Sequence, residues 1–110
     1  MHQDWNEGFQ HHKVAAAHGI PRAMYNLGTH YFMGKGAEQD FGEAVRLFEG
    51  AADRGFPQAM FNLATMLGEG RGVPQDVERS LEWYARAAEY GVKEAEMILG
   101  DPDSADNPPS

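Results

Sequence analysis

Five histidines are the residues with the most distinctive chemistry, because four of them lie within the first 18 positions. They are His2, His11, His12, His18 and His30. Imidazole nitrogens often bind zinc, at about 2.1 Å from the metal. On a helix, His11 and His12 would point about 100° apart, and His11 and His18 would lie about 10 Å apart, at about 1.5 Å per residue. The spacing therefore predicts no metal site and no cofactor, and a metal-binding protein that uses the N-terminal histidines stays as an alternative.

Side chains that could act as nucleophiles are scarce. Cysteine is absent, which excludes a thiolate nucleophile and a disulfide framework. Ser80 lies in no Gly-x-Ser-x-Gly turn, and no Lys follows it three residues later. The glycine-rich segment 68–72 lacks the Lys and the Ser or Thr of a phosphate-binding loop. We therefore predict that the protein is not an enzyme and has no catalytic residues.

The charge balance excludes two classes of partner. The chain has 9 Lys and Arg against 17 Asp and Glu, for a net charge of −8. Binding to nucleic acids and to anionic membranes depends on clustered Lys and Arg, which this chain lacks. No run approaches the about 18 apolar residues of a membrane span, and the N-terminus lacks the pattern of a secretory leader. The sequence predicts a cytoplasmic protein whose partner is a protein or peptide with basic residues.

An internal repeat of 36 residues organises the chain. The segment Ala23–Gly28 recurs without a gap as Ala59–Ala64, and Gln39-Asp40 recurs as Gln75-Asp76. The repeat domain is predicted over residues 1–100, with a half repeat (1–22), two full repeats (23–58 and 59–94) and a truncated start (95–100). Residues 101–110 have no apolar periodicity and are predicted to be a disordered acidic tail.

Each repeat has the apolar periodicity of two helices. Proline suits the first helical position, which places the first helices at about residues 21–33 and 57–67. Asp40 and Asp76 are the predicted N-caps of the second helices, and Asp4 is the predicted cap of a third. A short closing helix is expected at about residues 93–99. In this arrangement Leu27 and Leu63 occupy equivalent interior positions.

This pattern resembles the Sel-one-like repeat, a relative of the tetratricopeptide repeat. The matching residues are Ala23, Asn26-Leu27-Gly28, Tyr31, Gly34, Gly36, Gln39-Asp40, Ala44, Phe48, Ala51-Ala52 and Gly55, and in the second copy Gly70–Asp76, Trp83-Tyr84, Ala87-Ala88 and Gly91. The resemblance implies an all-α fold, a right-handed α-solenoid of antiparallel helix pairs whose first helices line the concave side. It also implies an adaptor that binds other proteins. A β-lactam hydrolase-like repeat protein is a second alternative, although the cysteines that staple some secreted members are absent.

The face of the first helices opposite their buried stripe is the predicted partner-binding surface. It carries an aromatic ring, an amide and a hydroxyl at matching positions one repeat apart. Its residues are Tyr25, Asn26, Thr29, Met33, Phe61, Asn62, Thr65 and Glu69. An asparagine amide both donates to and accepts from a peptide backbone, so the face is expected to hold an extended segment. The alternative is that Asn26 and Asn62 bond to a neighbouring helix.

The two ends of the solenoid are a predicted self-association surface. Each repeat covers the apolar face of the next, so a terminal face is bare unless it is capped. Trp5 and Phe9 mark the first end, and Met97 and Ile98 mark the last. The sequence therefore predicts a homodimer through the ends, or a place in a longer array.

Overall fold

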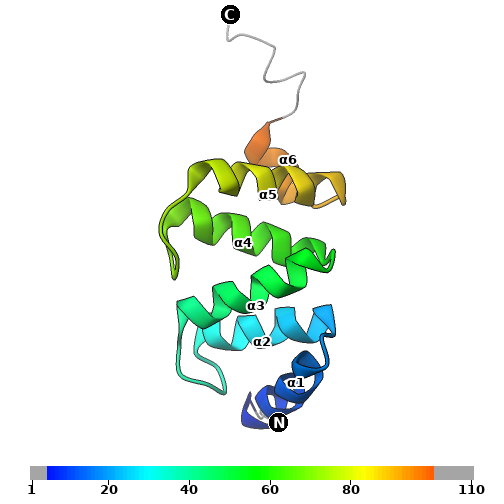
Figure 1. The fold of residues 1–110 in the computed structure, drawn as a ribbon, viewed down its shortest axis with the longest axis vertical. Helices are drawn as coiled ribbons and strands as arrows, with labels where there is room; N and C mark the ends of the chain where they lie inside the picture. Colours follow the sequence, from blue (N-terminus) through cyan, green and yellow to red (C-terminus); the bar gives the residue numbers. More distant parts are fainter. Residues whose placement is uncertain (1–4, 101–110) are drawn as a thin grey trace, which may run out of the picture.

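Six helices follow one another in the computed structural model, which describes residues 5–100 and contains no strand in that range. They are α1 (Trp5–Ala17), α2 (Pro21–Met33), α3 (Phe41–Asp53), α4 (Pro57–Glu69), α5 (Val77–Glu89) and α6 (Lys93–Leu99). Each helix packs most extensively against the helices before and after it, and Figure 1 shows them stacked in chain order. The all-α solenoid predicted from the repeat is confirmed.

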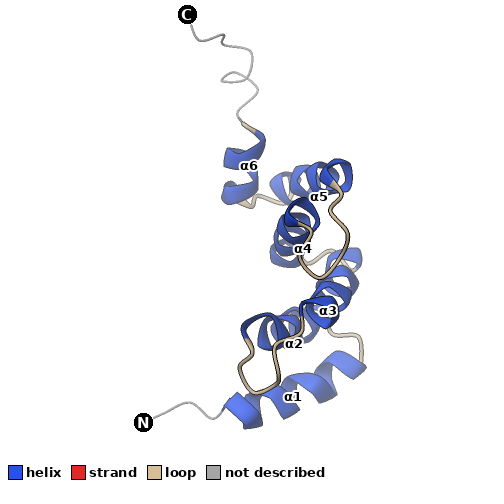
Figure 2. Cartoon of the chain, turned by 90° about the vertical axis from the view of Figure 1, so that its left-hand side faces the viewer, coloured by secondary structure: helices blue, strands red, loops and turns tan. Residues whose placement is uncertain are grey.

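The stack has two sides. Figure 2 shows α2, α4 and α6, the first helices of successive units, along one side, and α3 and α5 along the other. The predicted partner-binding residues of α2 and α4 therefore belong to the same side of the molecule. None of the helices in residues 5–100 has the length and apolar character needed to span a bilayer.

The helix starts agree with their sequence signals. Pro21 and Pro57 begin α2 and α4, where a proline loses no hydrogen bond. The Asp40 and Asp76 carboxylates cap α3 and α5 by accepting from the backbone N–H of the third helical residue, each at 3.1 Å. The predicted Asp4 cap and the predicted 101–110 tail lie outside the described residues.

Helix α4 runs to Glu69, two residues beyond the predicted end, because Gly68 is part of the helix. The buried Ser80 hydroxyl of α5 donates to the Ala64 carbonyl at 2.6 Å. A Cβ at position 68 would lie 2.9 Å from that hydroxyl oxygen. Gly68 and Ser80 both differ from the residues at the equivalent positions of the first repeat. The two differences belong together, because Gly68 leaves the space in which Ser80 bonds to α4.

Small residues line the contacts between helices. Among residues 5–100, seven helical alanines are fully buried: Ala44, Ala51, Ala52, Ala59, Ala64, Ala87 and Ala95. The largest fully buried side chains are Phe48, Met60, Leu63, Met66 and Leu67. Leu27 and Leu63 are 5% and 1% exposed, so the prediction that they occupy equivalent interior places is confirmed.

Two loop glycines bring backbone directly against backbone. Gly36, in the α2–α3 loop, has φ +79°, and Gly72, in the α4–α5 loop, has φ +76°. A Cβ at Gly36 would collide with the carbonyl of Trp5 at the start of α1, and one at Gly72 with the carbonyl of Phe41 at the start of α3. Each loop is therefore fixed by a contact that only glycine allows.

Replacement of Gly72 by alanine tests this contact against a matched glycine. Gly91 also has a positive φ, +92°, but a methyl group at that position would have nothing within 4 Å. Gly91→Ala therefore incurs backbone strain alone, of order 1–3 kcal/mol, whereas Gly72→Ala also forces the loop away from α3. We expect Gly72→Ala to lower the free energy of unfolding by at least about 1 kcal/mol more, as measured by urea denaturation. Equal losses would contradict the backbone contact.

Candidate partner-binding surface

Two hollows open on the α2 and α4 side of the stack. The α4 hollow, of about 210 Å³, is lined by Phe32, Phe48, Phe61, Asn62, Thr65, Met66, Glu69 and Arg71. The α2 hollow, of about 140 Å³, is lined by Trp5, His12, Asn26, Thr29, His30, Met33 and Lys35. Seven of the eight side chains predicted to bind a partner line one hollow or the other.

Tyr25 is the predicted residue that lines neither hollow. Its ring packs against Phe48 of α3, with centroids 5.7 Å apart, and against Phe56, with centroids 5.2 Å apart. These contacts tie α2 to α3 and to the start of α4, so Tyr25 contributes to the packing of the stack.

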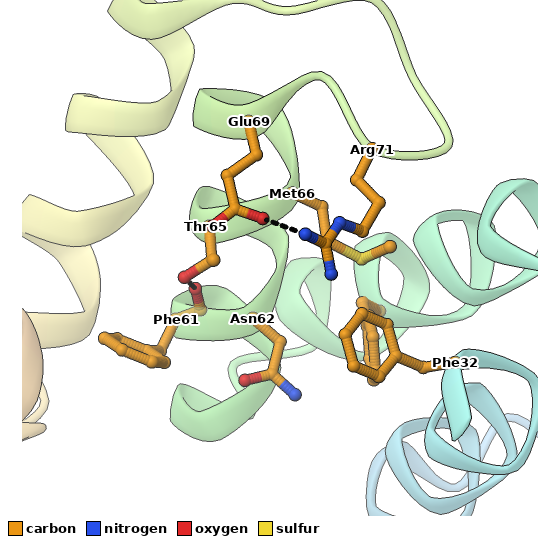
Figure 3. A pocket seen from close by; sticks show the side chains of 8 residues that line it. Phe32, Phe61, Asn62, Thr65, Met66, Glu69 and Arg71 are labelled. Atoms are coloured by element: carbon orange, nitrogen blue, oxygen red, sulfur yellow. Dashed lines mark hydrogen bonds and ion pairs between the residues drawn. The ribbon is translucent and has the colours of Figure 1, made fainter.

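The wall of the α4 hollow is mostly apolar. Phe32 of α2 faces the hollow from the side opposite Asn62 and Phe61 of α4 (Figure 3). The buried side chains of Phe48 and Met66 complete the apolar wall. An apolar cavity of about 150 Å³ is enough to hold benzene, so the α4 hollow has room for a large apolar side chain.

Thr65 is held in place by a hydrogen bond across two helices. Its hydroxyl donates to the Phe61 carbonyl at 3.1 Å. A hydroxyl has one proton, so the Tyr84 hydroxyl, 2.8 Å away on α5, donates to Thr65. The Tyr84 ring also packs edge-on against Phe61, with centroids 5.5 Å apart. Thr65 and Phe61 therefore stabilise the α4–α5 contact as well as lining the hollow.

The two asparagines differ in their partners. The Asn26 amide donates to Nε2 of His12 on α1 at 3.3 Å, which is the structural role that the sequence left open. The half-buried Asn62 amide has no hydrogen-bond partner among residues 5–100, and its head group lies toward the hollow in Figure 3. Asn62 therefore offers an unused donor and acceptor to a bound segment.

An ion pair closes the rim of the α4 hollow. Nη2 of Arg71 lies 3.2 Å from Oε1 of Glu69 (Figure 3). The same guanidinium lies 5.4 Å from the centre of the Phe41 ring, within the range of a cation–π contact. Glu69 and Arg71 therefore neutralise each other at this rim.

A chain of hydrogen bonds forms the wall of the α2 hollow. Nδ1 of His30 bonds to the Lys35 carbonyl at 2.7 Å, and Nε2 of His30 lies 2.9 Å from Nδ1 of His12. A carbonyl only accepts, so His30 carries its proton on Nδ1 and its neutral ring accepts on Nε2. His12 then donates from Nδ1 and accepts on Nε2 from Asn26. All ring nitrogens of the neutral pair therefore have hydrogen-bond partners.

Protonation of His12 is opposed by its surroundings. The pKa of His12 is lowered by burial and, to a lesser extent, by repulsion from His30 and His11. With both rings charged, N–H groups of His12 and His30 would face each other across the 2.9 Å contact. The folded chain therefore favours the neutral imidazole of His12.

The histidine pair and several apolar lining residues escaped the sequence analysis. His12 and His30 stand 36 residues before Phe48 and Met66, which are both buried. The alignment of the repeats could have revealed the pair, because it places both histidines at core positions of adjacent helices, where two rings can bond to each other. Phe32, Phe48, Met66 and Arg71 were also missed as lining residues, since a helical wheel places only one helix at a time.

The other sequence-derived sites are less concentrated in space. Within residues 5–100, no three His, Cys, Asp or Glu side chains lie close enough together to hold a metal ion, and His2 is outside that range.

Trp5, Met97 and Ile98, which the sequence placed at the self-associating ends, are 41%, 79% and 52% exposed. Phe9 is 8% exposed because it packs against His30 and Tyr31. The expectation that Phe9 belongs to a bare end is therefore corrected.

The stacked helix pairs, with recurring caps and a recurring groove, define a helical repeat protein. A family model described as the Sel1 repeat matches residues 21–56 and 57–91. The two matches begin at the prolines that open α2 and α4 and together span more than half of the sequence. The chain belongs to the Sel1 repeat family, whose members generally mediate protein–protein interactions.

Solved structures of repeat proteins superpose on the chain. A protective antigen of uropathogenic Escherichia coli with an SLR fold is 35% identical, with a TM-score of 0.86 over 88% of this chain and 21% of the antigen. A Sel1 repeat protein of Oxalobacter formigenes is 34% identical, with a TM-score of 0.83 over 87% of this chain and 39% of that protein. The chain thus spans well under half the length of both.

A third structure is similar in fold alone. The cysteine-rich protein B of Helicobacter pylori is 22% identical, with a TM-score of 0.79 over 83% of this chain and 68% of that protein. None of the curated proteins compared with the chain matches it. The comparisons therefore establish the family and the solenoid fold.

The lowered pKa of the half-buried His12 predicts a loss of stability in mild acid. Because the folded pKa of His12 is below the ordinary histidine value of 6.5, the folded state binds fewer protons than the unfolded state. The stabilising contribution of neutral His12 is complete above about pH 6.5 and is lost as the pH falls toward the lowered pKa. We expect the Tm to fall between pH 7.5 and pH 5.5, as measured by circular dichroism.

Two variants separate His12 from the other histidines. His12→Phe places at this position the side chain that the next repeat has at Phe48 and should make the Tm less dependent on pH. His18→Gln, at an exposed residue bonded only to the Val14 carbonyl, should retain the wild-type dependence. An unchanged pH profile in His12→Phe would contradict the assignment.

Proposed function

We propose that the protein is a non-enzymatic interaction module that binds an extended segment of another protein along the α2 and α4 hollows. The observation that carries the proposal is the pairing of an apolar hollow of about 210 Å³ with an Asn62 amide that has no partner among residues 5–100. A peptide backbone can use the amide, and its side chain can fill the hollow. Membership of the Sel1 repeat family supports the same function.

The charge of the chain bears on how such a partner would arrive. A net charge of −8 favours the encounter with a partner that carries basic residues, through long-range attraction more than through affinity. A cytoplasmic location stays a prediction of the sequence. No observation favours the metal-binding or β-lactam hydrolase alternatives over an interaction module.

Asn62 and Thr65 should separate binding from stability. Asn62→Ala removes an amide that contributes no hydrogen bond to the described fold, so it should abolish partner capture and leave the Tm within about 1 °C of wild type. Thr65→Ala removes the acceptor of the Tyr84 hydroxyl and should lower the free energy of unfolding by about 1 kcal/mol. Capture is measured by pull-down from the source cell, with each variant as bait.

The control is Asn26→Ala, which breaks the bond to His12 and should lower the Tm. Identification of the captured protein by mass spectrometry then supplies a defined partner for titration. A segment of that partner should bind wild type and fail to bind Asn62→Ala. Equal affinity for both proteins would overturn the proposed role of the α4 hollow.

The exposed end at α6 supports a second, weaker association between copies. Met97, Ile98 and Leu99 are 79%, 52% and 36% exposed, and burial of apolar area contributes about 25 cal/mol per Å². We expect light scattering at about millimolar concentration to show dimers, and Met97→Glu with Ile98→Glu to restore monomers. Val77→Glu changes a similarly exposed apolar residue, 55% exposed, and should leave the dimer intact. A monomeric wild type at this concentration would contradict self-association.

A further inference from the structure

The two hollows are copies of one site at successive repeats. Trp5, His12, Asn26, Thr29, His30, Met33 and Lys35 of the α2 hollow stand 36 residues before Phe41, Phe48, Asn62, Thr65, Met66, Glu69 and Arg71. Six of those seven counterparts line the α4 hollow, and the seventh, Phe41, carries the Arg71 guanidinium on its ring. A segment that lies across both hollows therefore meets the same framework twice.

The framework keeps a cation over an aromatic ring at both rims. The Lys35 ammonium lies 5.8 Å from the centre of the Trp5 ring, as Arg71 lies 5.4 Å from that of Phe41. Both cations line their hollow. The aromatic rings hold the cations at corresponding places, so a charged group on a bound segment would meet either one in the same geometry.

The rims differ in net charge because of one residue. Arg71 is paired with Glu69 at 3.2 Å, whereas the position equivalent to Glu69 in the first repeat is Met33. No ion pair joins Lys35 to a carboxylate within residues 5–100. Within the part of the chain that the structure describes, the α2 hollow thus has one uncompensated positive charge at its rim, and the α4 hollow has none.

The floor of the α2 hollow accepts an apolar group in spite of its histidines. All nitrogens of the neutral His12 and His30 rings are used by Asn26, by each other and by the Lys35 carbonyl. Among residues 5–100, His11 from α1 acts electrostatically on His12, and Lys35 from the α2–α3 loop lines the same hollow. Among residues 5–100, no carboxylate lines this hollow, so Lys35 on the rim is the group that would attract an anion.

We propose that the two hollows bind different parts of one partner segment. The α2 hollow binds a large apolar side chain that is flanked by Asp or Glu, and the α4 hollow binds a large apolar side chain without an acidic neighbour. This inference rests on the proposed function, and it fixes the direction in which the segment lies along the stack. Successive helices pack about 8–10 Å apart, so α2 and α4 lie at most about 20 Å apart. An extended chain covers that distance in about six residues.

The test uses two small probes that differ by one charge. N-acetyl-phenylalanine has a carboxylate beside its phenyl group, and its amide is neutral. Each is titrated at pH 7.5 into the ¹⁵N-labelled full chain, and binding is followed by the side-chain amide signals of Asn26 for the α2 hollow and Asn62 for the α4 hollow. We expect the acid to bind the α2 hollow roughly two- to five-fold more tightly than the amide, the range typical of an exposed ion pair, and the α4 hollow to bind both equally.

Two variants at exposed residues are expected to change the preference of a hollow for the acid over the amide. Lys35→Gln should make the two probes equal at the α2 hollow. Glu69→Met reproduces the first-repeat rim by releasing Arg71, and should give the α4 hollow the preference for the acid.

The outcomes separate this inference from the proposed function. Equal binding of both probes at the wild-type α2 hollow, no binding there, or a preference that survives Lys35→Gln would overturn the inference while binding at Asn62 still supports the proposed function. A lack of response at both asparagines would overturn the proposed function itself.

Discussion

The close contact between successive helices is the constraint on which this structure depends. No helix pair can bury its apolar face alone, and each does so against the next pair. The contact requires small residues, and Ala44, Ala51, Ala59, Ala64 and Ala87 are completely shielded from solvent. Packing is concentrated between neighbours in the chain. The face of α2 and α4 that carries the two hollows therefore contributes less to the core.

One repeat position gives each part of the groove its own chemistry. Residues 12, 48 and 84 are equivalent in the register of 36, and they are His, Phe and Tyr. His12 bonds to His30 and Asn26, Phe48 packs against Tyr25, and Tyr84 donates to Thr65. His12 thus contacts the first helix that follows it in the chain, whereas Phe48 and Tyr84 contact the first helix that precedes them. The groove therefore varies along its length although the helices that build it are nearly the same.

Most of the fold could be predicted from the sequence because local and periodic signals agree. Prolines at positions 21 and 57, aspartates at 40 and 76, and the repeat of Leu27 at Leu63 fixed the helix starts and the interior. The end of α4 was missed, since the space that Gly68 leaves for Ser80 depends on another helix. Phe9 was expected at a bare end, yet its ring meets His30 and Tyr31 of α2.

The candidate site was less predictable than the fold for a physical reason. A helical wheel identifies residues on one face, and it correctly selected seven lining side chains on α2 and α4. It carries no information on what the neighbouring helix supplies, so it missed Phe32, Phe48 and the histidine pair. It also treated Asn26 and Asn62 alike, whereas one is occupied by His12.

The loop glycines have a consequence for how this kind of protein diversifies. At Gly36 and Gly72 the main chain of a loop touches the main chain of an earlier helix, so the bend of the stack is set by peptide groups. A side chain that faces the groove without bonding to a neighbouring helix, such as Asn62, can then be exchanged without altering the curvature. A lineage of such proteins can acquire new partners by point mutation while the frame that presents the residues stays constant.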